Sequence, residues 1–149
     1  MQKIDVLSRR ITISEMRGRE VSDYISTNFR ELTRLERNAE IKRMRKDIRK
    51  LQRSNYPSKI ILAIRAKDRK DKVIGVITLS NVSEAFGADM DITIPNEILA
   101  KSYGRDAICK LVSKVKETKC LPEIRLNEEN NIKNSYMAAD QMPAVIKIA

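Results

Sequence analysis

Short stretches of alternating or continuous apolar residues recur along the chain, and they are typical of strands. Two of them, 59–66 and 73–80, are almost continuously apolar and flank a charged turn. They are therefore expected to pair as an antiparallel hairpin that is covered on both faces. A third stretch, 88–94, alternates between apolar and polar residues and is closed by Pro95. The expected strands are 11–13, 59–66, 73–80, 88–94, 122–127 and 144–148.

Longer stretches in which apolar residues recur every three or four positions predict amphipathic helices. The expected helices are about 20–35, about 37–53, 105–118 and 134–140. One helix falls between the strands 88–94 and 122–127, which should therefore run parallel. The 149 residues are expected to form one domain of the α/β (α+β) class, with a mixed, mainly antiparallel central sheet of about six strands and helices on both faces. Residues 1–10 form a leader that the pattern does not place.

The strictly alternating strand leads through a loop, residues 96–104, into the helix that starts near Arg105. A loop that enters a helix N-terminus presents backbone amides and the positive end of the helix dipole, which suits a phosphate group. Ser102 and Gly104 would let an anion approach the backbone, and Lys101 and Arg105 add positive charge. The same local pattern also fits a unit that merely connects two elements.

The segment 88–112 contains an acidic strand, a proline at the end of that strand and the run K-S-Y-G-R-D-A at 101–107. In these features it resembles motif A of the GNAT superfamily of acyl-coenzyme A N-acyltransferases. In that motif, loop amides within the pattern Q/R-x-x-G-x-G/A hold the coenzyme A pyrophosphate. The six positions correspond here to Leu99, Ala100, Lys101, Ser102, Tyr103 and Gly104. Leu99 stands where Gln or Arg is usual. Ser102 stands where the first Gly is usual, and serine adopts positive φ less readily than glycine.

The order of the predicted elements is also that of this superfamily, so the resemblance extends over nearly the whole chain. It implies a transferase that uses acetyl-CoA as co-substrate and acylates a primary amine of a small molecule or peptide by direct attack. The backbone of Ile92, Thr93 and Ile94 would bond to the acyl-pantetheine arm, and one amide there would polarise the thioester carbonyl. Asn131 would contact the same arm, unless it is simply a helix cap.

The resemblance also implies candidates for proton transfer. Asp89 falls where family members often carry an acid, so it is the expected base or water-positioning group; the alternative is an ordinary exposed acid. Alternation places Asp89 and Asp91 on one face, where the two carboxylates could raise each other's pKa. Tyr136 is the candidate that protonates the leaving thiolate, although it lies about two residues early when counted from Asn131. Tyr103 is expected to pack or to contact the ligand.

The net charge of +10 is concentrated in the first 70 residues, which carry 20 Lys and Arg against 9 Asp and Glu, whereas the rest carries 10 against 11. Much of this charge lies on the expected second helix, whose basic side is either a solvated face or a patch for a partner. The alternative to an active enzyme is therefore a catalytically weak or inactive module of the same fold that binds nucleic acid or an acidic protein. Nucleic acid is not favoured, because an aromatic content of 4% argues against stacking on single strands.

The chain has no histidine, and Cys109 and Cys120 lack the spacing of metal ligands, so both are expected to be free thiols and no metal is predicted. No apolar run approaches the length of a membrane span, and residues 1–10 lack the apolar core of a signal peptide. A cytoplasmic location is therefore expected. The last strand of the superfamily is not evident in the sequence, and a sheet edge left open would suit a homodimer.

Overall fold

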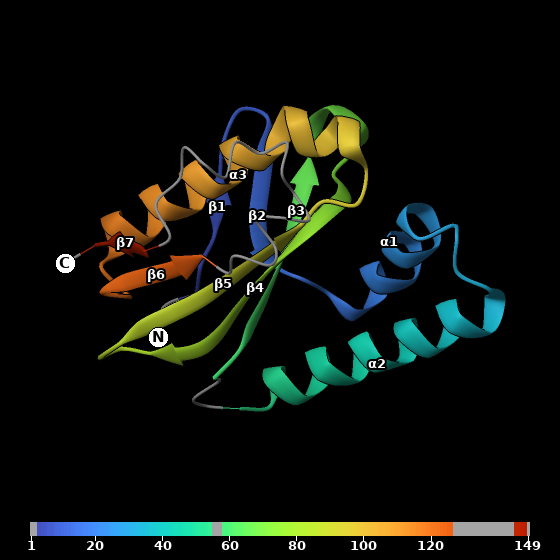
Figure 1. The fold of residues 1–149 in the computed structure, drawn as a ribbon, viewed down its shortest axis with the longest axis horizontal. Coiled ribbons are helices and arrows are strands. Elements are labelled where there is room, and N and C mark those ends of the chain that lie inside the picture. The colour runs from blue at the N-terminus through green and yellow to red at the C-terminus, as the bar shows by residue number, and fades with distance from the viewer. Residues whose placement is uncertain (1–2, 55–57, 127–144, 149) are drawn as a thin grey trace.

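The computed structural model describes residues 3–54, 58–126 and 145–148, whose strands form one seven-stranded sheet in the order β1-β2-β3-β4-β5-β6-β7 (Figure 1). Neighbouring strands are antiparallel except β5 and β6, which are parallel. The strands are β1 Val6–Leu7, β2 Ile11–Glu15, β3 Ile60–Ala66, β4 Lys72–Ser83, β5 Gly87–Thr93, β6 Glu123–Leu126 and β7 Val145–Lys147. The expected mixed, mainly antiparallel sheet is confirmed.

The sheet has one strand more than the sequence pattern indicates. Part of the unplaced leader forms β1, which pairs antiparallel with β2, so that Val6 lies opposite Ile13. Two residues are too short a stretch to show an alternation, and β1 is stabilised by burial of Val6 in the core.

Three α-helices, α1 Val21–Asn28, α2 Arg34–Gln52 and α3 Glu97–Thr118, and the short 3₁₀ helices η1 Gly18–Glu20 and η2 Lys67–Arg69 complete the described residues. The first helix ends well before the expected position near residue 35. The reason is a capping box at the start of α2: the Thr33 side chain accepts a hydrogen bond from the Glu36 amide, and the Glu36 carboxylate accepts one from the Thr33 amide. A new helix therefore begins at Arg34.

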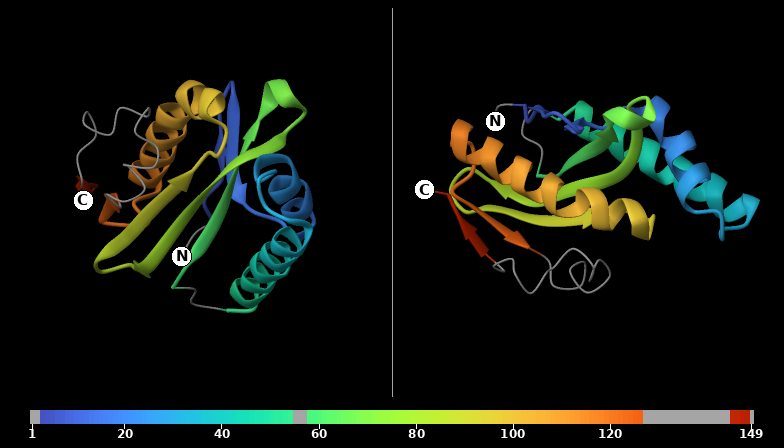
Figure 2. Two further views of the ribbon diagram at one scale, coloured as in Figure 1. Left: turned by 45° about the vertical axis from the view of Figure 1, so that its right-hand side comes forward. Right: turned by 90° about the horizontal axis from the view of Figure 1, so that it is seen from above.

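Helices cover the two faces of the sheet separately, with α3 on one face and α1 and α2 on the other (Figure 2). The alternation along β3 shows how this arises. Leu62 and Ile64 belong to the apolar core under α3, whereas Ile61 and Ala63 belong to the core under α1 and α2. Because side chains of a strand point alternately to opposite faces, a continuously apolar strand is buried on both sides. This confirms the covered hairpin.

A buried ion pair fixes the entrance to α1. Arg65 on β3 is only 7% exposed, and its guanidinium donates to both carboxylate oxygens of Glu20 over 2.6 and 2.8 Å. It also donates to the Ser14 hydroxyl over 2.6 Å and to the Glu15 carbonyl over 3.1 Å. Burial by itself would raise the pKa of Glu20, but hydrogen bonds from Arg65 and from the backbone of Arg17 hold that pKa below its ordinary value.

Candidate functional site

The segment expected to be an anion-binding loop is the first part of helix α3. Asn96 caps this helix, because its side-chain oxygen accepts hydrogen bonds from the amides of Ile98 and Leu99 over 3.0 and 3.1 Å. The Ala100 amide already donates to the Asn96 carbonyl over 2.9 Å. Residues 101–104 lie in the helix interior, where amides donate to carbonyls four residues earlier. The expectation of a loop at 96–104 is therefore wrong.

Packing explains why the chain is helical here. Leu99, Ala100, Tyr103 and Gly104 are buried against the sheet, in phase with Ala107 further along α3. The apolar period of the sequence predicts this helix but places its start near residue 105 rather than at Glu97. No residue from 96 to 104 adopts positive φ, which removes the reason for a glycine in place of serine.

Two basic residues of the motif remain accessible on α3. Lys101 and Arg105 are both exposed and lie four positions apart, so they share one face of the helix. Ser102 is exposed as well, but its hydroxyl accepts a hydrogen bond from Arg10 over 2.8 Å, and its carbonyl accepts one over 3.1 Å. The motif thus presents side-chain cations rather than a cradle of amides.

Arg10 and Asp68 are two residues of this region that the sequence reading did not single out. The Arg10 guanidinium lies over the Tyr103 ring, and the Tyr103 hydroxyl donates to Asp68 over 2.6 Å. The hydrogen bond to the Asp68 carboxylate raises the pKa of Tyr103. Tyr103 is therefore buried and held by these two contacts, while a contact with a ligand stays a prediction. No local pattern links these positions, since Arg10 lies 92 residues before Ser102 in the chain.

The described pairing between β5 and β6 covers only part of β5. The parallel pairing with β6 covers Ala88 to Met90, and β5 continues to Thr93 (Figure 1). Ile92 and Ile94 point into the core, and Thr93 is exposed. The last residues of β5 are thus backed by β4, and the described pairing with β6 ends at Leu126, where the described part of the chain is interrupted.

Gly75 on β4 lets β4 and the end of β5 approach each other closely. A Cβ placed on Gly75 would lie 2.6 Å from the Thr93 carbonyl oxygen and 2.7 Å from Cγ1 of Ile94. Contacts below 3.0 Å do not occur for real Cβ atoms. Glycine is therefore required here, and it sets the position of the Thr93 backbone.

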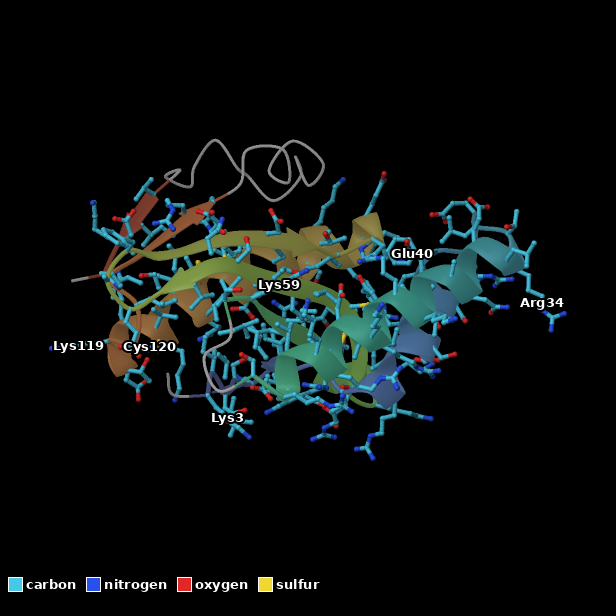
Figure 3. The ribbon with its side chains drawn as sticks, turned by 90° about the horizontal axis from the view of Figure 1, so that it is seen from below. Lys3, Arg34, Glu40, Lys59, Lys119 and Cys120 are labelled. Atoms are coloured by element: carbon cyan, nitrogen blue, oxygen red, sulfur yellow. The ribbon has the colours of Figure 1, made fainter. Side chains whose placement is uncertain are left out.

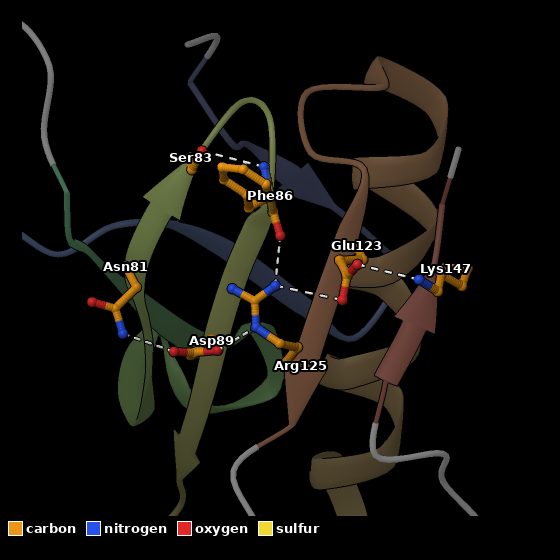
Figure 4. Close-up of polar contacts among 7 residues, drawn as sticks. All are labelled: Asn81, Ser83, Phe86, Asp89, Glu123, Arg125 and Lys147. Atoms are coloured by element: carbon orange, nitrogen blue, oxygen red, sulfur yellow. Dashed lines mark hydrogen bonds and ion pairs between the residues drawn. The ribbon is translucent and has the colours of Figure 1, made fainter.

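Asp89 is held in a polar network between three strands (Figure 4). Its carboxylate accepts hydrogen bonds from Nδ2 of the Asn81 side chain over 2.8 Å and from Nε of Arg125 over 2.6 Å. Arg125 also forms an ion pair with Glu123 over 3.4 Å. The hydrogen bonds from Asn81 and from Arg125 lower the pKa of Asp89. The expected upward shift of the Asp89 pKa is therefore wrong, because these hydrogen bonds outweigh the effect of burial, which alone would raise the pKa.

The remaining candidates are residues that the structure does not describe and two cysteines. Tyr136, Asn131 and the expected helix at 134–140 fall in the segment 127–144, which the structure does not describe. Cys109 and Cys120 are free thiols. Over the residues that are described, no group of three His, Cys, Asp or Glu side chains could hold a metal ion, and no helix is long and apolar enough to cross a membrane.

This sheet, in which the parallel strands β5 and β6 are joined through α3 and helices cover both faces, matches the acyl-CoA N-acyltransferase fold. The comparison with solved structures agrees. A Vibrio cholerae protein assigned as a ribosomal-protein-serine acetyltransferase matches with a TM-score of 0.70 at 12% identity, over 92% of this chain and 81% of that one. The ribosomal-protein-S5-alanine acetyltransferase of Vibrio fischeri matches with a TM-score of 0.63 at 13% identity, over 91% and 81%.

A third structure contains the co-substrate. The microcin C7 self-immunity acetyltransferase MccE, in complex with acetyl-CoA and AMP, matches with a TM-score of 0.61 at 16% identity, over 90% of this chain and 79% of that one. The chain therefore has the fold of the GNAT-family acetyltransferases. No family model matches the sequence, and no curated protein matches it either.

Proposed function

We propose that this protein transfers an acyl group, acetyl in the simplest case, from acyl-CoA to a primary amine of a small molecule or peptide. The observation that carries the proposal is the fold, which is shared with acetyltransferases and in which β5 leads directly to the start of α3. By the resemblance to the superfamily, the backbone at the end of β5 would bond to an extended ligand as a further strand would. A CoA-dependent activity also fits the cytoplasmic location expected from the sequence.

The chain's own groups have defined parts in this proposal. The backbone of Ile92, Thr93 and Ile94 holds the acyl-pantetheine arm and orients the thioester for attack by the amine. One amide of this segment donates to the thioester oxygen, where negative charge develops. Gly75 supports that geometry, because it lets β4 back the Thr93 carbonyl without a side chain between them.

Side chains replace amides in the proposed contact with the pyrophosphate. The amides of Leu99 to Gly104 are hydrogen-bonded within α3 or to its cap, so they are not presented to a ligand. Lys101 and Arg105 share an exposed face and can bind phosphate oxygens through charge-assisted hydrogen bonds. We therefore assign the diphosphate to these two side chains.

Asp89 and Tyr136 remain our candidates for the proton transfers, and Asn131 for contact with the pantetheine arm. Asp89 is ionised at neutral pH, but its lowered pKa makes it a weak base while Arg125 holds it. Its role in this proposal is to position the amine or a water molecule rather than to remove a proton by itself.

The test is thermal melting with and without saturating acetyl-CoA, because a ligand that binds only the folded state raises its melting temperature. Wild-type protein and Ser102→Ala should show the rise, whereas Ser102→Trp should lose it, since an indole at this exposed position blocks the adjacent face of α3. The double change Lys101→Gln/Arg105→Gln should weaken binding about 10- to 100-fold if each side chain contributes a charge-assisted hydrogen bond.

Release of free coenzyme A in the presence of an amine panel then measures the reaction. No rise in melting temperature for wild-type protein would contradict the proposal. An equal rise in Ser102→Trp would place the ligand elsewhere on the molecule.

A further inference from the structure

Helix α2 carries a row of cations that its own acids do not neutralise. Lys42, Lys46, Arg49 and Arg53 follow one another at steps of four, three and four residues, so they form a stripe along one side. All four are exposed, while Ile48 on the opposite side is buried. We call these four residues the α2 stripe. Figure 3 shows α2 along one edge of the molecule, with Arg34 at its outer end.

The acidic side chains of α2 pair with groups outside the α2 stripe. Glu40 and Asp47 both pair with Arg43, over 2.8 and 3.4 Å, and Glu36 closes the capping box with Thr33. Within the described part of the chain, the side chains of the α2 stripe make no hydrogen bond and no ion pair. The stripe is therefore a continuous positive surface, not a mixed solvated face.

Like charges meet repeatedly along this side of the helix. The i,i+4 pairs are Lys42–Lys46, Arg45–Arg49, Lys46–Lys50 and Arg49–Arg53. Like-charge pairs at this spacing destabilise a helix, whereas the pairing of Arg43 with its acids stabilises it. A bound polyanion would remove this repulsion.

The length of the stripe suits a row of phosphates. The eleven steps from Lys42 to Arg53 span about 16 Å at a rise of 1.5 Å per residue. One strand of a duplex places a phosphate about every 3.4 Å along its axis, so several phosphates fall within that length. Arg17 and Arg19 are also exposed, and η1, which contains Arg19, is joined to α2 by a hydrogen bond from Arg45 to the Gly18 carbonyl over 3.3 Å. Additional cations thus lie beside the stripe.

The chemistry of this surface favours a duplex over a single strand. Single-strand binding proteins stack bases on aromatic side chains. Tyr24 near α2 is buried, and Phe29 packs edge-on against it, so neither offers a ring face for stacking. Phe86, the one exposed aromatic ring among the described residues, lies in the β4–β5 turn, away from α2. We propose that the α2 stripe binds the phosphate backbone of a nucleic-acid duplex without reading its sequence, a function independent of acyl transfer.

The experiment measures fluorescence anisotropy of a labelled 20-base-pair DNA duplex of mixed sequence between 50 and 200 mM salt. With four phosphate contacts, log K should fall with log salt at a slope of about −4, a loss on the order of 100-fold over this range. The variant Lys42→Gln/Lys46→Gln/Arg49→Gln/Arg53→Gln should lose at least 10-fold in affinity at 50 mM salt, and its slope should approach zero. The melting temperature of this variant should not fall, because the repulsion between the like charges of the stripe is removed.

A matched control changes the net charge equally at exposed positions away from α2: Lys67→Gln/Lys72→Gln/Lys110→Gln/Lys116→Gln. This variant should keep the affinity within about threefold and most of the salt slope. Equal loss in both variants would show a response to net charge alone and overturn the proposal. So would binding that is insensitive to salt, no binding at 50 mM salt, or polyglutamate binding that the duplex does not compete away.

Discussion

The guanidinium carbon of Arg10 lies 4.4 Å from the centroid of the Tyr103 ring, at the point where the β1–β2 turn meets the first part of α3. The same guanidinium donates two hydrogen bonds to Ser102 and lies 4.0 Å from Asp106. On the other side, Tyr103 donates to Asp68 in η2. The beginning of α3 is thus held by two turns of the sheet, which stabilises the helical form of the segment that the sequence predicted to be a loop.

Removing the Arg10 side chain should loosen this attachment. Arg10→Ala should lower the free energy of unfolding by about 1 kcal/mol, because a partly exposed cation–π contact and two hydrogen bonds are lost. Amide hydrogen exchange at residues 97–104 should become faster, while exchange in the second half of α3 stays unchanged. Arg9→Ala is the control, since Arg9 is exposed and makes no contact of this kind within the described residues. An equal loss in Arg9→Ala would mean that charge, not contact, is responsible.

Alanine at position 75 should disturb the end of β5. The added Cβ meets the Thr93 carbonyl oxygen at 2.6 Å, so Gly75→Ala should destabilise the protein by about 1 to 3 kcal/mol and shift the Thr93 backbone. Acetyl-CoA binding should weaken further than the loss of stability explains, measured by calorimetry well below the melting temperature. Gly18→Ala provides the matched control, because nothing lies within 4 Å of the added atom, and it should be neutral or slightly stabilising.

Removing only the carboxylate of the buried Arg65–Glu20 ion pair should lower the free energy of unfolding strongly. Glu20→Gln leaves the Arg65 charge buried without its carboxylate and should lower the free energy of unfolding in urea by about 3 to 5 kcal/mol. The double variant Arg65→Met/Glu20→Gln should recover most of this loss, since no unpaired charge remains buried. If the double variant is as unstable as the single one, packing of the arginine stem rather than its charge matters.

Stability should depend on pH through Asp89. Its pKa is lower in the folded protein than in the unfolded chain, so its contribution is present above the unfolded value of about 4 and is lost as the pH falls through the folded value. Asp89→Asn should therefore be less stable than wild type at pH 7, and the difference should shrink toward pH 2 in urea unfolding experiments. A difference that does not change with pH would show that Arg125 does not stabilise the ionised form.

The pattern of apolar residues was sufficient to predict the class of fold. Continuous apolar stretches at β3 and β4 and the three-to-four-residue period of α3 are local properties, and each requires burial on a definite face. The parallel pairing of β5 and β6 follows from the helix between them. Resemblance to motif A indicated the same fold, and the comparison with solved structures agrees.

Local signals were less reliable where two of them compete. The run from Asn96 to Gly104 contains small residues that suit an anion loop, but also a helix cap and the apolar period of Leu99, Ala100 and Tyr103. Burial of these side chains on the sheet outweighs the loop signal, because leaving them exposed would cost the hydrophobic free energy that drives folding. The amides of the motif are consequently used within α3.

The order of the main strands and helices, the faces they bury and the positive charge along α2 follow from residues close together in the chain, whereas β1, the end of α1 and the start of α3 do not. Three relationships depend on the packing of distant elements: Arg10 contacts Tyr103, Arg125 lowers the pKa of Asp89, and Gly75 lies against the end of β5. These relationships join residues 18 to 93 positions apart. They exist only after packing brings the sheet, its turns and α3 into one fixed arrangement, and no local period encodes that distance.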